Sequence, residues 1–141
     1  MHIEVTETPK AADEEFIAAQ VRAHNRAHTE NAFRTLCVFL RADDGTILGG
    51  LTGKTYWEYL DVYFLWVAPE HRGAGLASKI LAVAESEAIQ RGCRHVLLNT
   101  FSFQAPAFYP KVGYEVVGLV SGYRGINGLH DRHYMHKSLG L

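Results

Sequence analysis

The fold of this chain is decided by the stretch Leu65-Trp66-Val67-Ala68-Pro69-Glu70-His71-Arg72-Gly73-Ala74-Gly75-Leu76-Ala77. It reads as the end of a buried strand, a short polar turn and a Gly-rich loop that opens a helix. Backbone N–H groups at such a helix start converge on one point and favour an anion, usually a phosphate. Gly73 and Gly75 would let a pyrophosphate approach the main chain, and Arg72 adds a planar cation.

The spacing within this stretch separates it from other phosphate loops. A P-loop ends in Gly-Lys-Ser/Thr, whereas the corresponding run here is Ala77-Ser78-Lys79. A dinucleotide fingerprint needs a Gly or Ala where Ser78 stands, and it follows the first strand directly. A plain Gly-rich turn from strand to helix, with no ligand, remains the structural alternative.

The bulk properties describe an ordinary globular chain. Its 141 residues suit one domain, and 48% of them are hydrophobic and 21% charged. A net charge of −1 indicates neither nucleic acid nor membrane as a partner. Residues 1–5 lack the features of a signal peptide. Cys37 and Cys93 are expected to be buried free thiols in a reducing compartment, which predicts a cytoplasmic protein.

The elements beside the Gly-rich stretch follow from hydrophobic periodicity. Tyr59 to Val67 is strongly apolar and predicts the central strand, and a helix is expected from Gly75 to Arg91. Its apolar stripe is Leu76, Ile80, Ala84 and Ala88 with Leu81 beside it, whereas Glu85 and Glu87 are expected to face water. A second buried strand is expected from Cys93 to Thr100.

Further elements are expected on both sides of this unit. A first strand is predicted over Ile3 to Thr8, and a helix capped by Asp13 runs to about Ala27. The remaining predictions are a hairpin of Leu36–Ala42 and Ile47–Thr52 around Asp43-Asp44-Gly45, a short helix over Ala105–Val112, and final strands over Tyr114–Ser121 and His133–Ser138 joined by a loop over 122–132.

This order of elements predicts the fold class. It is a mixed, mostly antiparallel α/β sheet with helices on both faces and one central βαβ unit. Residues 1–141 are expected to form a single domain.

Two sequence blocks resemble a known family. Val67 followed by Arg72-Gly-x-Gly-x-Ala77 is similar to the acetyl-CoA loop of the GNAT superfamily of N-acetyltransferases. The second block, Ala105, Tyr109, Gly113 and Tyr114, resembles that family's Ala-x-x-x-Tyr-x-x-x-Gly-Phe/Tyr element. The resemblance covers nearly the whole chain and is nearest to a branch of small bacterial acetyltransferases. It implies direct transfer of an acetyl group from acetyl-CoA to a primary amine of a small molecule or peptide.

The resemblance also implies which residues hold the cosubstrate. The main chain of the central strand would pair with the pantetheine, and the Gly-rich loop would bind the pyrophosphate. The implied residues are Leu65, Trp66, Val67, Arg72, Gly73, Ala74, Gly75, Leu76, Ala77 and Ser102. Ser102 stands where many relatives carry Asn, so Gln104 or Asn99 is the alternative contact.

Two residues are implied to move protons. Tyr109 matches the phenol that protonates the leaving thiolate, and its alternative role is a packing aromatic. Asp61 lies six residues before Val67, at the position of a strand-borne Glu in histone-type relatives, and would act as base through a water. Alternation along the strand would place it in the cleft with Tyr63 and Leu65. A solvated carboxylate is its alternative role.

The predictions about the acceptor site and the oligomeric state rest on single residues and not on motifs. Asn25, Trp57 and His130 are expected around the substrate pocket. His24 and His28 lack a third ligand, so no metal site is expected. The apolar Leu139 and Leu141 and the thin helical cover of the last strands favour a homodimer. Alternative functions are a non-catalytic acyl-CoA-binding module and a nucleotide-binding or metal-hydrolase protein.

Overall fold

The computed structural model describes residues 1–30 and 33–140. Its contacts divide the chain into two compact units, Met1–Ala32 and Phe33–Leu141, and each is described by itself. The single domain over residues 1–141 therefore stays a prediction. None of the described helices is long and apolar enough to cross a membrane.

The first unit contains one helix, α1 (Ala11–Asn25). The predicted strand over Ile3 to Thr8 is wrong: residues 1–10 form no helix or strand, because no other strand pairs with them. The N-cap is Lys10 and not Asp13, which lies in the first turn. A carboxylate there still favours the helix through the positive end of its dipole.

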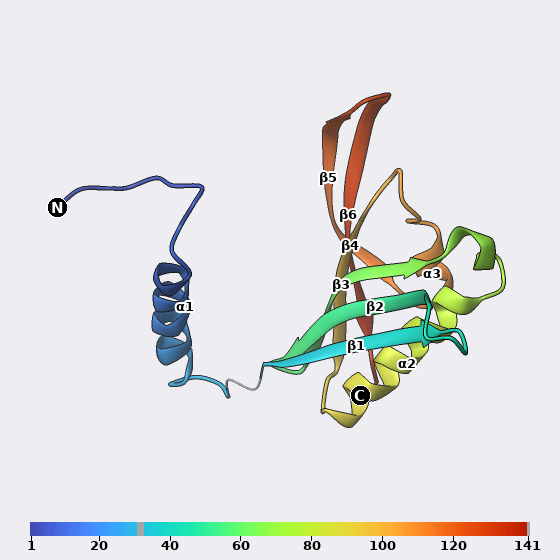
Figure 1. Cartoon of the computed structure of the whole chain (residues 1–141), viewed down its shortest axis with the longest axis horizontal. Coiled ribbons are helices and arrows are strands. Elements are labelled where there is room, and N and C mark those ends of the chain that lie inside the picture. Colours follow the sequence, from blue (N-terminus) through green and yellow to red (C-terminus); the bar gives the residue numbers. More distant parts are fainter. Residues whose placement is uncertain (31–32, 141) are drawn as a thin grey trace. The chain divides into compact units, whose positions relative to one another are not determined.

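The second unit is built on a six-stranded sheet with the order β1-β2-β3-β4-β6-β5 (Figure 1). Its strands are β1 (Arg34–Arg41), β2 (Ile47–Tyr56), β3 (Tyr59–Val67), β4 (His95–Phe101), β5 (Glu115–Gly125) and β6 (Gly128–Ser138). Only β3 and β4 run parallel; the other neighbours are antiparallel. The crossover from β3 to β4 carries the 3-10 turn η1 (Pro69–His71) and α2 (Leu76–Gln90). The predicted mixed, mostly antiparallel sheet with a central βαβ unit is confirmed.

Helix α2 packs on the buried core of the sheet through the expected stripe. Ile80, Leu81, Ala84 and Ala88 are buried among side chains of the first four strands. The short α3 (Phe108–Lys111) adds Phe108 and Tyr109 to the same core.

Two predictions about burial are wrong. Glu85 is 8% exposed and does not face water, since it follows Leu81 by one helical turn and shares its face. Cys37 is exposed because it alternates with the buried Leu36 on β1. Cys93 is buried as expected, and both thiols are free.

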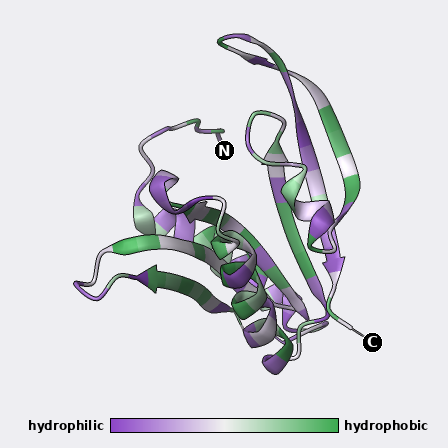
Figure 2. Ribbon diagram, turned by 90° about the vertical axis from the view of Figure 1, so that its right-hand side faces the viewer, coloured by the Kyte–Doolittle hydropathy of each residue, from purple (hydrophilic) through white to green (hydrophobic). Residues whose placement is uncertain are grey.

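The last two strands are longer than the sequence predicts. The expected loop over 122–132 is wrong: β5 continues to Gly125 and β6 begins at Gly128. Gly122 and Gly128 have positive φ angles of 85° and 135°, so they absorb a bulge and a tight turn without ending the pairing. The outer part of this hairpin projects beyond the other strands (Figures 1 and 2).

Candidate active site

Strands β3 and β4 diverge and open a space between them. They pair only at Tyr59 to Asp61 with His95 to Leu97, and no pairing follows. A bulge lies where the strands part: Thr52 faces Phe64 while Gly53 faces Val62, which leaves Tyr63 as the extra residue. Gly53 is required there because a Cβ would clash with the Asp61 carbonyl oxygen.

The bulge changes which face each β3 side chain occupies. Leu60 and Val62 point into the core, and after the bulge Leu65 and Val67 pair with the core-facing Leu51 and Gly49. Asp61 therefore lies on the opposite face from Leu65. The prediction that simple alternation places both in the cleft is wrong, since the extra residue shifts the alternation by one.

The Gly-rich loop has the backbone that an anion site needs. Gly73 and Gly75 have φ angles of 83° and 75°, and a Cβ on either would meet no atom within 4 Å. Gly75 is the N-cap of α2, and the first turn of α2 contains no acidic residue. The helix start thus presents unopposed N–H groups to open space.

Arg72 is fixed beside this loop. Its Nε donates to the Val67 carbonyl oxygen at 2.9 Å, which leaves the terminal amino groups of the guanidinium directed elsewhere. Bidentate contacts from such groups suit phosphate oxygens. Arg72 therefore both closes the turn after β3 and offers a cation to an anion on the loop.

The main chain of β3 faces the gap at alternate residues. Ala68 N–H donates to the Leu48 carbonyl at 2.8 Å, while Val67 faces Gly49 in the register. Antiparallel pairs alternate between bonded and non-bonded positions, so the N–H of Val67 turns away from β2. The Val67 N–H is thereby directed toward the gap between β3 and β4.

A cavity of about 740 Å³ gathers most of the predicted cosubstrate residues. Its lining joins β3, the Gly-rich loop and the α3 region: Leu65, Trp66, Val67, His71, Arg72, Gly73, Gly75, Leu76, Ala77, Ser78, Phe103, Gln104, Ala105, Phe108 and Tyr109. Ala74 and Ser102 are the two predicted residues that it lacks. His71, Ser78 and Phe103 also line the cavity but were not predicted to do so, because each becomes a wall residue only when the loop folds over the strand end.

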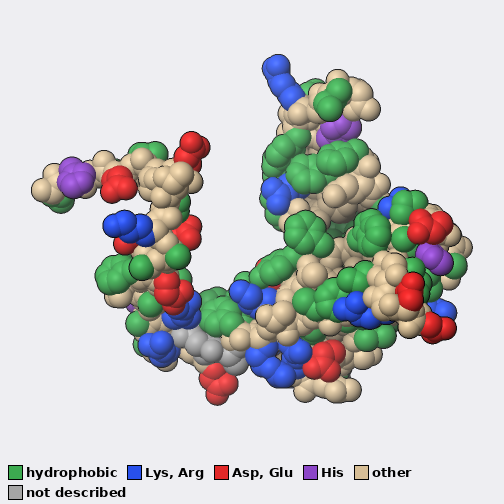
Figure 3. Space-filling view, in the orientation of Figure 1, with side chains coloured by type: hydrophobic (Ala, Val, Ile, Leu, Met, Phe, Trp, Pro, Cys, Tyr) green, Lys and Arg blue, Asp and Glu red, His purple; other side chains and the backbone are tan. Residues whose placement is uncertain are grey.

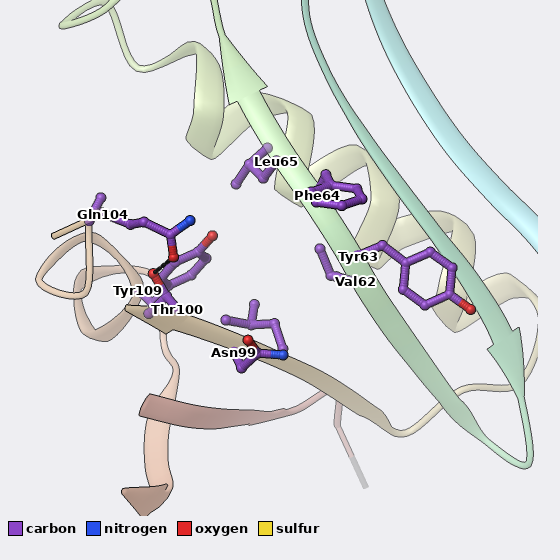
Figure 4. Close-up of a pocket in the computed structure, with 10 residues that line it drawn as sticks. Val62, Tyr63, Phe64, Leu65, Asn99, Thr100, Gln104 and Tyr109 are labelled. Carbon is purple, nitrogen blue, oxygen red and sulfur yellow. Dashed lines mark hydrogen bonds between the residues drawn. The ribbon is translucent and has the colours of Figure 1, made fainter. Parts of the chain in front are cut away.

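A smaller cavity of about 140 Å³ lies in the gap between β3 and β4. Figure 4 shows Leu65 facing Gln104 and Tyr109 across it, whereas the ring of Tyr63 points away. Leu65, Gln104, Ala105 and Tyr109 line both cavities, so Tyr109 stands where they adjoin. Burial raises the pKa of the Tyr109 phenol, which keeps it protonated at neutral pH.

Ser102 does not line either cavity and instead makes hydrogen bonds to the main chain of Asp131. Its hydroxyl accepts from the Asp131 N–H at 3.0 Å, and its own N–H donates to the Asp131 carbonyl at 2.9 Å. Gln104 instead lines both cavities, and its Oε1 accepts from the Phe101 N–H at 2.7 Å. Gln104, and not Ser102, thus lines the cavities.

Of the predicted acceptor residues, the two in the second unit, Trp57 and His130, line neither cavity. Asn25 belongs to the first unit, and Trp57 packs beside Phe33 and Tyr56 at the β2–β3 turn. His130 lies on β6, where its Nδ1 is 3.4 Å from the Ser102 hydroxyl. Within residues 1–30 and 33–140, no group of three or more His, Cys, Asp or Glu is arranged to hold a metal ion.

A buried polar network behind Tyr109 was missed. The Tyr114 hydroxyl donates to Glu85 Oε2 at 2.7 Å, and Lys137 Nζ donates to Glu85 Oε1 at 2.8 Å. The Tyr114 N–H donates to the Tyr109 carbonyl at 3.0 Å, and the two rings meet edge to face. The network therefore ties α2 and β6 to Tyr114, which lies between α3 and β5. The position of Glu85 on the apolar stripe of α2 is the signal that reveals it.

Replacing Glu85 with Ala is expected to lower the free energy of unfolding by about 3 kcal/mol, since it leaves Lys137 and the Tyr114 hydroxyl without their partner. The matched control is Glu87→Ala on the same helix, whose pair with Arg91 is partly exposed and should contribute less than about 1 kcal/mol. Urea unfolding measures both losses. Equal losses in the two variants would show that the Glu85 network contributes no special stability.

Comparison with known proteins agrees with this geometry. A family model described as "Acetyltransferase (GNAT) family" matches residues 3–114. The chain belongs to the GNAT family of acetyltransferases.

Individual relatives of this GNAT chain cover it to different extents. An acetyltransferase of Agrobacterium fabrum is 34% identical over 119 residues, 84% of this chain and 87% of that protein. The blasticidin-S acetyltransferase of Streptomyces morookaense is 42% identical over 80 residues, 56% of this chain and 59% of that protein, so the match spans less than two thirds of it. The crystal structure of an acetyltransferase from Bacillus cereus is 32% identical, with a TM-score of 0.81 and coverage of 98% of this chain and 99% of that one.

Proposed function

We propose that this GNAT chain transfers an acetyl group from acetyl-CoA directly to a primary amine of a small molecule or peptide. The observation that carries the proposal is the larger cavity, in which the Gly-rich loop, the Val67 main chain and Tyr109 line one space. The name of one relative, blasticidin-S acetyltransferase, supports a small-molecule acceptor. Two free cysteines suit a reducing compartment, and we propose a cytoplasmic location.

The proposed reaction uses groups that line the larger cavity together with Asp61, which lines neither cavity. Arg72 and the N–H groups of residues 73–77 hold the pyrophosphate, and the pantetheine amides pair with the β3 main chain. The Val67 N–H donates to the thioester oxygen as the amine attacks its carbon. As the carbon–sulfur bond breaks, the Tyr109 hydroxyl gives its proton to the thiolate. Asp61 takes the proton of the amine through a water. Solvent then takes this proton from Asp61 and restores the proton of Tyr109.

Asp61→Asn is expected to lower the rate at every pH. Burial raises the pKa of the Asp61 carboxyl, although the Lys54 ammonium opposes this, so the base loses its proton above the ordinary pKa of about 4. The wild-type rate should therefore rise with pH as base and amine deprotonate. Rates are measured with two acceptors of different amine pKa, because the amine gives a rising limb of its own. A near wild-type rate for the variant with both acceptors would place the base elsewhere.

We also propose a homodimer formed through β5. This strand is at the edge of the sheet, and it exposes Val116, Val117, Leu119 and Val120. Figures 2 and 3 show hydrophobic residues along the hairpin of β5 and β6. An apolar edge strand invites pairing with a second copy. Leu139 is half-buried, and Leu141 lies outside the described residues. X-ray scattering should show a dimer that Val117→Lys dissociates; a monomer at high concentration would contradict it.

The test of the proposed activity is a screen of primary amines read by release of the CoA thiol. Thiol release that depends on both acetyl-CoA and an amine would support the enzyme. Tight acetyl-CoA binding with no thiol release from any amine would favour the non-catalytic acyl-CoA-binding module. Binding of NAD or ATP, with none of acetyl-CoA, would overturn both.

A further inference from the structure

Arg132 on β6 carries a positive charge that pairs with no carboxylate among residues 1–30 and 33–140. Its guanidinium carbon lies 5.3 Å from the ring centre of Phe101 and 5.1 Å from that of Tyr134. Its Nε donates to Asn99 Oδ1 at 3.0 Å. Two rings and one hydrogen bond thus hold the guanidinium in place while its terminal amino groups make no bond to the described residues.

Arg132 lies on the same face of the sheet as the proposed base. On β4 and β6, Asn99 faces Tyr134 and Phe101 faces Arg132, and Leu98, Met135 and Thr100 point into the core on the other face. Asp61 pairs with Leu97, two residues before Asn99 on β4. Asp61, Asn99 and Arg132 therefore follow one another across three adjacent strands. Leu97 and Asn99 are about 7 Å apart along the strand.

The smaller cavity is connected to Arg132 through Asn99. Its lining contains no charged side chain. Asn99 is part of that lining, and its side-chain oxygen is the group to which Arg132 donates. Arg132 is thus one hydrogen bond from the cavity where Tyr109 and Leu65 face each other. An ionised group on an acceptor in this gap would find its partner in Arg132.

We propose that Arg132 binds a carboxylate of the acceptor, so that the acceptor is an amino acid or a similar amine that carries a carboxylate. The proposal rests on the proposed acetyltransferase function. With Nε bound to Asn99, the two terminal amino groups present parallel donors, which suits the two oxygens of a carboxylate. The amine of the same molecule would then point along β4 toward Asp61.

The test compares matched acceptors and matched variants. Amino acids and their primary amides are assayed in pairs, because the amide keeps the amine and the shape but removes the charge. The wild-type protein should prefer the carboxylate. Arg132→Gln should raise KM for the carboxylate acceptors by about tenfold or more and leave KM for the amides and for acetyl-CoA unchanged. Arg132→Lys, which keeps the charge, should retain part of the preference.

Arg124→Gln is the matched control. Arg124 is an exposed residue of β5, it lines neither cavity, and its substitution removes the same charge from the same hairpin. It should leave the preference unchanged. A wild-type protein without the preference, or an equal loss in Arg132→Gln and Arg124→Gln, would overturn the proposal.

A binding measurement separates this proposal from the proposed activity. Calorimetry in the presence of CoA compares N-acetylglycine and other N-acetylated amino acids with their amides, on the wild-type protein and on Arg132→Gln. If no amine releases CoA thiol, the activity fails, and binding still decides the role of Arg132. Tighter binding of the carboxylates that is lost in Arg132→Gln would support it. The absence of any such difference would overturn it even in an active enzyme.

Discussion

Gly75→Glu is expected to abolish acetyl-CoA binding. Gly75 is the N-cap of α2 with a φ of 75°, and the space beside its Cα is open. A carboxylate in that space would repel the pyrophosphate where the N–H groups of the helix start should bind it. Isothermal calorimetry with acetyl-CoA measures the effect.

The control for this variant is Gly92→Glu. Gly92 follows α2 at its other end with a φ of 88°, and it also has no atom within 4 Å of a built Cβ. Both substitutions impose the same left-handed strain of about 1–2 kcal/mol, but only Gly75 lines the cavity. Gly92→Glu should lose stability and keep its acetyl-CoA affinity. Unchanged affinity in Gly75→Glu would remove the phosphate-loop assignment.

Tyr109→Phe is expected to lower kcat by about 10²–10⁴-fold while the affinity for acetyl-CoA stays the same. The variant loses only the hydroxyl, and the ring still packs on the core beside Phe108 and Tyr114. Burial raises the pKa of this phenol above its ordinary value of about 10. A fall in the rate that reports its deprotonation should therefore appear only at a pH above that value. Steady-state kinetics at saturating acetyl-CoA measures the change.

A second tyrosine provides the control for that loss. Tyr56→Phe removes a hydroxyl from the aromatic cluster at the β2–β3 turn, outside both cavities. It should run at the wild-type rate. If Tyr109→Phe does so as well, Tyr109 is a packing residue and a water donates the proton.

A thiol ester with a better leaving group provides an independent check of the same role. A thiolate of low basicity leaves readily without being protonated. With an acyl donor that carries such a thiol, the difference in kcat between Tyr109→Phe and the wild-type protein should therefore be smaller. An equal difference in kcat with both donors would indicate that the substitution displaces the substrate, and not that it removes the proton donor.

The parts of the fold that the sequence predicts well are those whose hydrophobic pattern and flanking residues lie within one short segment. The predicted helix from Gly75 to Arg91 is found as Leu76–Gln90, and the predicted strand from Tyr59 to Val67 is found with the same bounds. The helix is a long periodic segment with Gly75 before it and Gly92 after it, and the strand is a strongly apolar run. The strand predicted over Ile3 to Thr8 alternates just as well, but it has no partner strand, and alternation alone does not supply one.

The arrangement of the candidate site depends on register, which the sequence does not show. The spacing of Gly73, Gly75 and Tyr109 in the sequence was enough to predict the cosubstrate loop and the acid that we propose, because a Gly-rich helix start has a local signature. The face on which Asp61 lies could not be predicted in this way, since one bulge beside Gly53 changes the face of every residue after it relative to Asp61.

By itself, therefore, the sequence determined the βαβ unit and its Gly-rich loop, which rest on backbone preferences within short segments, and the family, which rests on two short motifs. Only the tertiary structure decided that Glu85 is buried against Tyr114, that Ser102 bonds to Asp131 while Gln104 lines the cavities, and that Arg132 lies beside Asn99. Each of these pairs joins residues 29 or more positions apart in the chain or depends on a strand pairing. Such contacts follow from register and packing, and no local pattern in the sequence encodes them.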